Sequence, residues 1–218
     1  MLPEAFLAPP LVARSVLVTE GLTRAFGPRR ALDGVSIGVP RGALVALIGP
    51  NGAGKSTLLR LAAGLDRPTS GRVLIAGIDP QQDGPAARSN LSFLAQDAGL
   101  YDALTVRENL AFVAQYFGRV AEITRVAETM GIASLLDERA GTLSRGERQR
   151  AVISRAFLGG ELLLLDEPTT ALDEDARARL LCALGSRRGK RTMLVATHDE
   201  EIAKRCDTTL HLAGGHLV

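Results

Sequence analysis

The segment Gly49–Thr57 constrains the fold of this chain most, because it fits the pattern G-x-x-x-x-G-K-[ST] at every fixed position. The residues before it, Ala43–Ile48, form a continuous apolar run of the length of a strand. After it, leucine and alanine recur at helical spacing from Leu58 to Leu65. A strand, a glycine-rich loop and a helix in this order predict an α/β core, with the loop at the carboxyl end of a strand.

The residue types in this loop suit a bound phosphate. Glycines at 49, 52 and 54 let backbone N–H groups approach phosphate oxygens, and the following helix directs its positive end to the same anion. Lys55 is expected to reach the terminal phosphates and Ser56 to ligate Mg²⁺. The alternative, a tight turn with a solvated lysine, does not explain the flanking strand and helix. The predicted nucleotide contacts are Gly49, Pro50, Asn51, Gly52, Ala53, Gly54, Lys55, Ser56 and Thr57.

Polar residues follow two further apolar runs. Leu162–Leu165 reads as a strand buried on both faces, and it is followed by Asp166 and Glu167; Met193–Ala196 is followed closely by His198. Ligands of parallel sheets gather at the carboxyl ends of strands. We therefore predict that Asp166 binds Mg²⁺ and that Glu167 polarises an attacking water. The alternatives are a solvated strand exit for the acidic pair and a structural or surface role for His198.

The middle of the chain differs from its flanks. Residues 85–158 carry helical signals, including a capping box at Thr105–Glu108, whereas 16–84 and 159–218 carry the strands. This pattern predicts a helical subdomain inserted into an α/β core. Residues 1–15 read as a flexible leader, or as the result of a start codon placed too early. The remaining predicted strands are Val16–Thr19, Val35–Val39, Arg72–Ile75, Leu91–Leu94 and a closing pair in Thr209–Val218.

Composition excludes several classes of function. The 26 basic and 24 acidic residues give a net charge of +2, so nothing indicates a nucleic-acid partner. Cys182 and Cys206 form no metal-binding or redox motif and are expected to be reduced thiols. No apolar run approaches the roughly 18 residues that span a bilayer, so a membrane role requires a partner chain.

Together these motifs resemble the ATP-binding subunit of ABC transporters, from Val16 almost to the end of the chain. Gln96 falls at the Q-loop position, after a short strand and before the helical insert. Phe26 takes the place of the adenine-stacking aromatic, although packing in the core is an equal alternative. The other matching segments are the phosphate loop Gly49–Thr57, the signature Leu143–Glu147, the Walker B strand Leu162–Glu167, the D-loop Thr170–Asp173 and the switch histidine His198.

The resemblance implies a fold and a mechanism. The fold is an α/β P-loop NTPase core with a mixed, mainly parallel sheet and a helical subdomain between the Q-loop and the signature. Two copies close head to tail on ATP, so that Ser144, Gly146 and Asp173 of one chain face the nucleotide of the other. Gln96 joins Ser56 and Asp166 around Mg²⁺ and water. Glu167 then acts as the general base and His198 contacts the γ-phosphate.

The signature departs from the family pattern. Arg145 replaces a glycine and Glu147 replaces a glutamine, which places an additional carboxylate near ATP. Ser144-x-x-Glu147 is also a capping box, a purely structural pattern. Both roles can hold if Glu147 folds back on the Ser144 N–H. Our hypothesis is that this cap turns Glu147 away from the nucleotide.

The resemblance implies an ATP hydrolase that drives a transmembrane permease subunit, peripheral to the cytoplasmic face of the membrane and most consistent with an exporter. The segment Gly99–Leu110 looks like ABC-2 exporters, and the short chain is similar to the haem exporter of cytochrome c maturation. The alternative is a soluble ABC-type ATPase acting on DNA or the ribosome, against which stand the missing heptad arms, second nucleotide domain and basic tract. Candidates for the coupling surface are Tyr101, Leu104 and Phe112, with a core position the alternative for Phe112.

Overall fold

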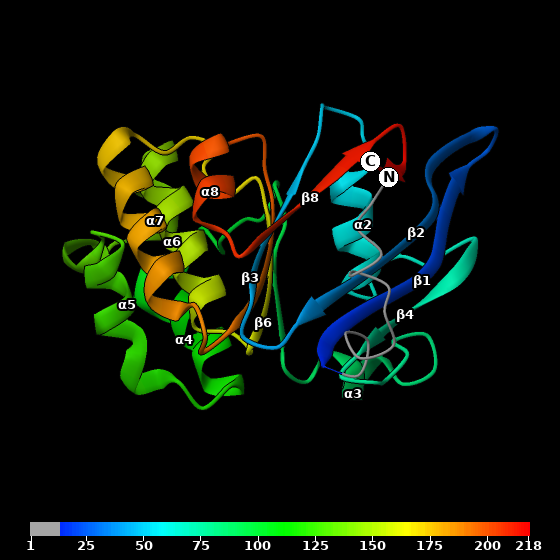
Figure 1. Cartoon of the computed structure of the whole chain (residues 1–218). Helices are drawn as coiled ribbons and strands as arrows, with labels where there is room; N and C mark the ends of the chain where they lie inside the picture. The colour runs from blue at the N-terminus through cyan, green and yellow to red at the C-terminus, as the bar shows by residue number, and fades with distance from the viewer. Residues whose placement is uncertain (1–13) are drawn as a thin grey trace.

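A computed structural model describes residues 14–218 (Figure 1). The predicted leader 1–15 therefore lies almost wholly outside the described residues. Two sheets flank helix α2, and five further helices cover the outer face of the larger sheet, in the left half of Figure 1.

The larger sheet has six strands in the order β5-β6-β7-β3-β8-β9. Its first five strands pair in parallel, and only β9 runs antiparallel to its neighbour β8. The predicted mixed, mainly parallel sheet is thus confirmed. Every residue of β6 and β7 is buried, as expected for strands covered on both faces. The strands are β3 (Leu44–Ile48), β5 (Leu91–Leu94), β6 (Leu162–Asp166), β7 (Thr192–Ala196), β8 (Thr208–Ala213) and β9 (His216–Leu217).

The smaller sheet is antiparallel, in the order β2-β1-β4. Its strands β1 (Ser15–Phe26) and β2 (Arg29–Pro40) are much longer than the predicted Val16–Thr19 and Val35–Val39. The two strands form one hairpin across the turn at Gly27 and Pro28, and pairing continues from Ser15 opposite Pro40 to Phe26 opposite Arg29. The predicted bounds were wrong because cross-strand pairing extends both strands beyond their apolar centres. Strand β4 (Ser70–Ile75) completes the sheet.

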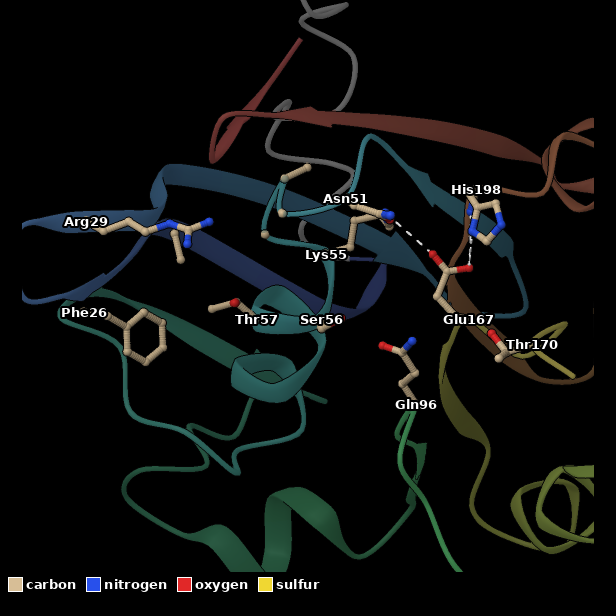
Figure 2. A pocket seen from close by; sticks show the side chains of 14 residues that line it. Phe26, Arg29, Asn51, Lys55, Ser56, Thr57, Gln96, Glu167, Thr170 and His198 are labelled. Carbon is tan, nitrogen blue, oxygen red and sulfur yellow. Dashed lines mark hydrogen bonds and ion pairs between the residues drawn. The ribbon is translucent and has the colours of Figure 1, made fainter. Parts of the chain in front are cut away.

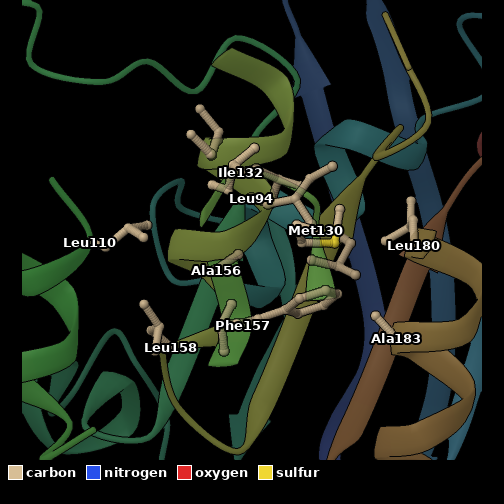
Figure 3. Close-up of a cluster of buried hydrophobic side chains, with 14 of the residues drawn as sticks. Leu94, Leu110, Met130, Ile132, Ala156, Phe157, Leu158, Leu180 and Ala183 are labelled. Atoms are coloured by element: carbon tan, nitrogen blue, oxygen red, sulfur yellow. The ribbon is translucent and has the colours of Figure 1, made fainter. Parts of the chain in front are cut away.

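Helix α2 (Lys55–Ala62) lies between the two sheets, and four of its eight residues are leucine or alanine side chains buried there. A second cluster of buried side chains, which includes Phe157, joins the other face of the large sheet to the outer helices (Figure 3). These helices are α4 (Val106–Tyr116), α5 (Ile123–Thr129), α6 (Arg145–Phe157), α7 (Glu174–Arg187) and α8 (Glu200–Arg205).

The predicted capping box is present, with Thr105 and Glu108 bonding reciprocally at the start of α4. Within the span of predicted helical signals, one short element is a 3₁₀ helix, Ala133–Leu135. Two more 3₁₀ helices, Val120–Glu122 and Ala140–Thr142, and the short helix α3 (Gly84–Arg88) complete the described elements.

The division of the chain at residues 85 and 158 remains a prediction. However, β5 lies inside that span and pairs with β6 in the large sheet. We therefore place the start of the helical part after Leu94 rather than at residue 85. Gln96 then lies where the chain leaves the sheet for the helices.

Candidate active site

A cavity of about 580 Å³ opens at the carboxyl ends of β3 and β6, around the start of α2 (Figure 2). Phe26 and Arg29 lie toward one end of it, and Glu167 and His198 toward the other. Most of the predicted site residues meet here, although they come from distant parts of the chain. Those that line the cavity are Phe26, Asn51, Gly52, Ala53, Gly54, Lys55, Ser56, Thr57, Gln96, Glu167 and His198.

Two glycines of the loop, Gly49 and Gly54, are required by close packing. A Cβ on Gly49 would lie 2.0 Å from the Leu212 carbonyl oxygen, and one on Gly54 would lie 2.4 Å from that of Ala31. Gly54 also has φ +108°, which is unfavourable for other residues. Helix α2 begins at the next residue, so its first N–H groups, which have no partners within the helix, face the cavity. This arrangement suits phosphate oxygens.

Lys55 is a buried cation of the cavity, and its side chain is only 7% exposed. Its Nζ donates hydrogen bonds to the carbonyl oxygens of Gly49 at 2.7 Å and Pro50 at 3.3 Å. The same nitrogen lies 3.6 Å from Oε1 of Glu167. The amine is therefore held against the loop, with a carboxylate as its nearest counter-charge.

Glu167 follows strand β6 directly and has a positive φ of +47°. Its N–H donates to the Ala196 carbonyl at the end of β7, at 2.8 Å, which holds this unusual backbone in place. Its buried carboxylate lies 2.8 Å from Nδ1 of His198 through Oε2. The His198 side chain is 71% exposed, so the ring lies at the rim, where a bound molecule can reach it. The structure thus brings together both predicted reactive groups.

Asp166 faces a smaller adjoining cavity of about 280 Å³, which Ser56 and Gln96 also line. Its carboxylate is buried, and Oδ1 has no hydrogen-bond partner. Burial raises the pKa of Asp166 above its ordinary value of 3.8, and the Ser56 hydroxyl offsets this only in part. A divalent cation would supply the missing partner.

The donor set fits Mg²⁺. Within residues 14–218 no cluster of three or more His, Cys, Asp or Glu side chains could hold a metal alone. A carboxylate, a hydroxyl and an amide oxygen, from Asp166, Ser56 and Gln96, leave the other positions to water and phosphate, which is the arrangement that Mg²⁺ favours.

Two lining residues, Arg29 and Ala31, were not predicted, and Thr170 was named only as part of the D-loop segment and not as a nucleotide contact. Arg29 begins β2 and lies beside the loop, 3.6 Å from the position that a Cβ on Gly52 would take. Arg29 and Phe26 face each other across the hairpin turn, so only the register of β1 and β2 places both at the cavity. Recognising the hairpin would have found Arg29.

Phe26 is 51% exposed, and the Arg24 guanidinium lies 4.5 Å from its ring centre. The alternative that it packs in the core is therefore wrong. Its place at the end of the cavity allows the ring to stack on a flat ligand, and this stays a prediction.

The signature residues do not reach the cavity of their own chain. Ser144 and Gly146 begin α6, and Asp173 caps α7 by accepting the Ala176 N–H at 2.8 Å. None of these three residues lines the cavity. Ser144 is exposed. A single chain therefore presents a nucleotide cavity on one part of its surface and the signature on another.

The capping box of α6 is present. Oε2 of Glu147 accepts the Ser144 N–H at 2.9 Å and its hydroxyl at 2.7 Å, while the Glu147 N–H donates to Oγ of Ser144 at 3.4 Å. The bond from the Ser144 hydroxyl is the main cause of a lowered pKa for Glu147. The carboxylate is thus committed to the helix end, as the capping hypothesis requires.

Comparison with known proteins agrees with this geometry. A family model described as "ABC transporter" matches residues 32–170, which is more than half of the chain. The chain is 39% identical to the lipoprotein-releasing system ATP-binding protein LolD of Anaeromyxobacter dehalogenans, over 86% of this chain and 84% of LolD. It is 36% identical to the macrolide export ATP-binding/permease protein MacB 1 of Aeromonas hydrophila, over 93% of this chain. The chain spans only 34% of MacB 1, about a third of its length.

Solved structures show the same fold. The dimeric structure of MJ0796, described as a bacterial ABC transporter cassette, matches with a TM-score of 0.85 at 25% identity, covering 92% of this chain and 96% of that one. A dimeric post-hydrolysis state of the same cassette, bound to ADP and Pi, matches with a TM-score of 0.79 at 27% identity, with the same coverage.

Proposed function

This chain belongs to the ABC transporter family. We propose that it binds and hydrolyses ATP, and that ATP closes two copies head to tail to drive a separate membrane subunit. The observation that carries this proposal is the separation of the signature from the cavity. Ser144 and Gly146 are outside the cavity of their own chain, so a second copy is needed to bring them to a nucleotide.

We propose a role for each reactive side chain of the cavity. Lys55 and the N–H groups at the start of α2 would hold the phosphates, and Phe26 would stack on the base. Ser56, Asp166 and Gln96 would hold Mg²⁺, whose charge offsets that of the phosphates. Glu167 would take the proton of the attacking water, and His198 would contact the γ-phosphate from the rim. The chain thus supplies positioning and charge, which phosphoryl transfer chiefly needs.

We propose that Asp173 and the signature act across the interface between two copies. Asp173 caps α7, and the carbonyl oxygen of Ala171 lies 3.4 Å from the position of a Cβ on Gly146. The two segments therefore form one surface. At its centre Ser144 begins α6, which directs a positive helix end outward, where an anion on the partner copy can meet it.

The membrane partner would dock on a groove of about 280 Å³ beside α4 and α6. Tyr101 and Phe112 line it and are 59% and 66% exposed, so the core position considered for Phe112 is wrong. Leu104, 37% exposed, adds apolar surface nearby. Arg155 also lines the groove, and it forms no ion pair within residues 14–218. A helix with an apolar face and one carboxylate would fit this lining.

Within the described residues no helix has the length and apolar character to cross a bilayer. We propose that a permease supplies the path for the cargo and that this chain acts at the membrane surface through it. We propose export, which fits the names of MacB 1 and LolD, macrolide export and lipoprotein release. Haem as the cargo stays a prediction from the sequence alone. Neither name supports action on DNA or the ribosome.

The proposal is tested by supplying Mg²⁺ and ATP to the purified chain and measuring its mass in solution by light scattering. We expect a monomer without nucleotide and a dimer with ATP when hydrolysis is blocked. A monomer with ATP bound at saturation would contradict the head-to-tail closure, whereas failure to bind ATP at all would contradict the assigned cavity.

A further inference from the structure

A second polar cavity, of about 380 Å³, lies at the opposite edge of the large sheet from the nucleotide cavity. Arg191 immediately precedes β7 and Glu161 immediately precedes β6, so this cavity is at the amino ends of the parallel strands. Its lining holds five cationic and two acidic side chains. The lining residues are Arg119, Glu122, Arg125, Glu161, Ser186, Arg187, Lys190 and Arg191.

The two carboxylates are already engaged. Glu122 forms an ion pair with Arg119 through Oε1, at 3.0 Å, and another with Arg125 through Oε2, at 2.7 Å. Glu161 lies 3.9 Å from Arg41, outside the cavity. In the described part of the chain, no ion pair involves the remaining cations, Arg187, Lys190 and Arg191. Three positive charges therefore share one cavity without an ion pair of their own, and the two carboxylates of the lining offset them only in part.

Two of these cations interact with the carboxyl ends of helices, which explains part of their placement. Arg191 donates to the Phe157 carbonyl at 2.7 Å, at the end of α6, and Arg187 donates to the Ala183 carbonyl at 3.0 Å, in the last turn of α7. Cations are favourable at such helix ends. However, a guanidinium has five N–H donors, and each of these arginines uses one of them in its bond to a helix end. Most of their donors remain available to a ligand.

The two guanidinium groups are held rigidly. Arg187 stacks on the Phe157 ring at 4.1 Å, and Arg191 is only 7% exposed. Burial lowers the pKa of each to about 10, and repulsion from neighbouring arginines adds to the effect. The charged forms are thus destabilised in the chain alone, and a bound anion would relieve that cost.

We propose that this cavity binds a phosphate monoester dianion, separately from the nucleotide site. A dianion would offset most of the charge of Arg187, Lys190 and Arg191, and two planar guanidinium forks suit the tetrahedral oxygens of phosphate. The phosphate group can belong to a small soluble metabolite or to the headgroup of a lipid. The recognition chemistry is the same for both.

The test uses the full chain with its nucleotide cavity saturated by Mg²⁺ and a non-hydrolysable ATP analogue. Inorganic phosphate is then added, and the arginine Nε–H resonances are followed by NMR. We expect the resonances of Arg187 and Arg191 to shift and saturate. Sodium chloride at equal ionic strength should not shift them in the same way. Vesicles with and without phosphatidic acid form a second arm.

Two variants at exposed positions of the lining distinguish a specific phosphate site from non-specific electrostatic attraction of anions. Lys190→Gln and Arg125→Gln should each weaken phosphate binding, the first by about tenfold, as expected for the loss of one charge-assisted hydrogen bond. Arg205→Gln makes the same charge change at an exposed position of α8 and should leave phosphate binding unchanged. Saturable shifts with phosphate indicate a soluble ligand, and shifts only with phosphatidic acid indicate a lipid; both support the site. Equal shifts with chloride, or equal affinity in Lys190→Gln and Arg205→Gln, would overturn it.

Discussion

The carboxylate of Glu167 joins Lys55 to His198, with Oε1 3.6 Å from Nζ of the lysine and Oε2 2.8 Å from Nδ1 of the histidine. These are the two side chains that we expect to contact the terminal phosphate. A triphosphate would compete with Glu167 for both of them, because it brings more negative charge to the same place. We infer that nucleotide binding releases Glu167 to face the attacking water.

The first prediction concerns this carboxylate. Glu167→Gln removes the proposed general base but keeps the size of the side chain, so ATP should still bind. Turnover should fall by about 10²- to 10⁴-fold, the usual contribution of such a base. Phosphate release and light scattering in ATP measure the two effects, and the variant should accumulate as a closed dimer. Glu128→Gln, on the exposed face of α5, is the matched control. Normal hydrolysis by Glu167→Gln would remove Glu167 from the role.

The second prediction separates stability from activity at Asp166. Its pKa is raised by burial, and Oδ1 has no partner, so the ionised carboxylate opposes folding. Asp166→Asn should raise the free energy of unfolding by about 1 kcal/mol at neutral pH. The same variant should lose Mg²⁺-dependent hydrolysis, because a neutral amide is a poorer ligand for a hard cation.

The sign of the pH dependence provides a control. The raised pKa of Asp166 means that the folded chain favours the neutral acid. The stability that the folded chain gains from the neutral acid is fully present below pH 3.8 and is lost as the pH rises through the pKa of the folded state. The increase in the free energy of unfolding caused by Asp166→Asn should then be absent below pH 3.8 and complete at neutral pH. Denaturant unfolding without nucleotide measures it. A variant less stable than the wild type at neutral pH would contradict the effect.

Local sequence patterns predicted the parts of the site that local forces build. The loop at Gly54 was recognisable because its glycine is needed by packing against Ala31, and the strand before Asp166 because all of its residues are buried. The capping boxes at Thr105 and Ser144 each depend on residues three apart. Each of these features is encoded within a few residues.

Contacts between distant segments were not predictable in this way. Arg29 reaches the cavity only through the hairpin that pairs it with Phe26. The positive φ of Glu167 depends on a bond to Ala196 in a neighbouring strand. Asp173 and the leucines after it are typical of a helix, but the resemblance of Thr170–Asp173 to the D-loop does not by itself predict helix α7. The distance of Ser144 from its own cavity follows from the complete fold.

The third prediction compares the two members of the α6 cap. Ser144→Ala removes the acceptor of the Glu147 N–H and should lower the free energy of unfolding by about 1 kcal/mol. It should also weaken ATP-driven dimerisation, if Ser144 meets the nucleotide of the partner copy. Glu147→Gln retains the capping pattern and should leave stability nearly unchanged.

The ATPase rate of Glu147→Gln then tests the direction of that side chain. Because the carboxylate is bound to Ser144, its charge should have little influence on ATP, and the rate should change by less than about tenfold, or 1.4 kcal/mol. A larger increase would show that the carboxylate opposes ATP and that the cap does not turn it away. Steady-state phosphate release at saturating ATP is the measurement.

The last prediction concerns the docking groove. Phe112→Ala and Tyr101→Ala each remove an exposed aromatic ring from its lining, and the two rings contact each other edge to face with centroids 6.2 Å apart. Both variants should lower transport when the permease is supplied, since buried aromatic rings contribute strongly to interfaces. Basal ATPase activity of the isolated chain should be unchanged, because neither ring lines the nucleotide cavity.

Tyr116→Ala is the matched control for these variants. Tyr116 is 70% exposed and lies on the same helix, α4, but it does not line the groove. Arg155→Gln tests the positive charge in the lining of the groove. Loss of this charge should weaken binding of a partner that supplies a carboxylate, but not binding of a partner that is wholly apolar. Co-purification of the permease with each variant measures docking directly. Equal loss of docking in Tyr116→Ala and Phe112→Ala would place the partner along the whole exposed face of α4, whereas full docking in Phe112→Ala and Tyr101→Ala would place it elsewhere on the chain.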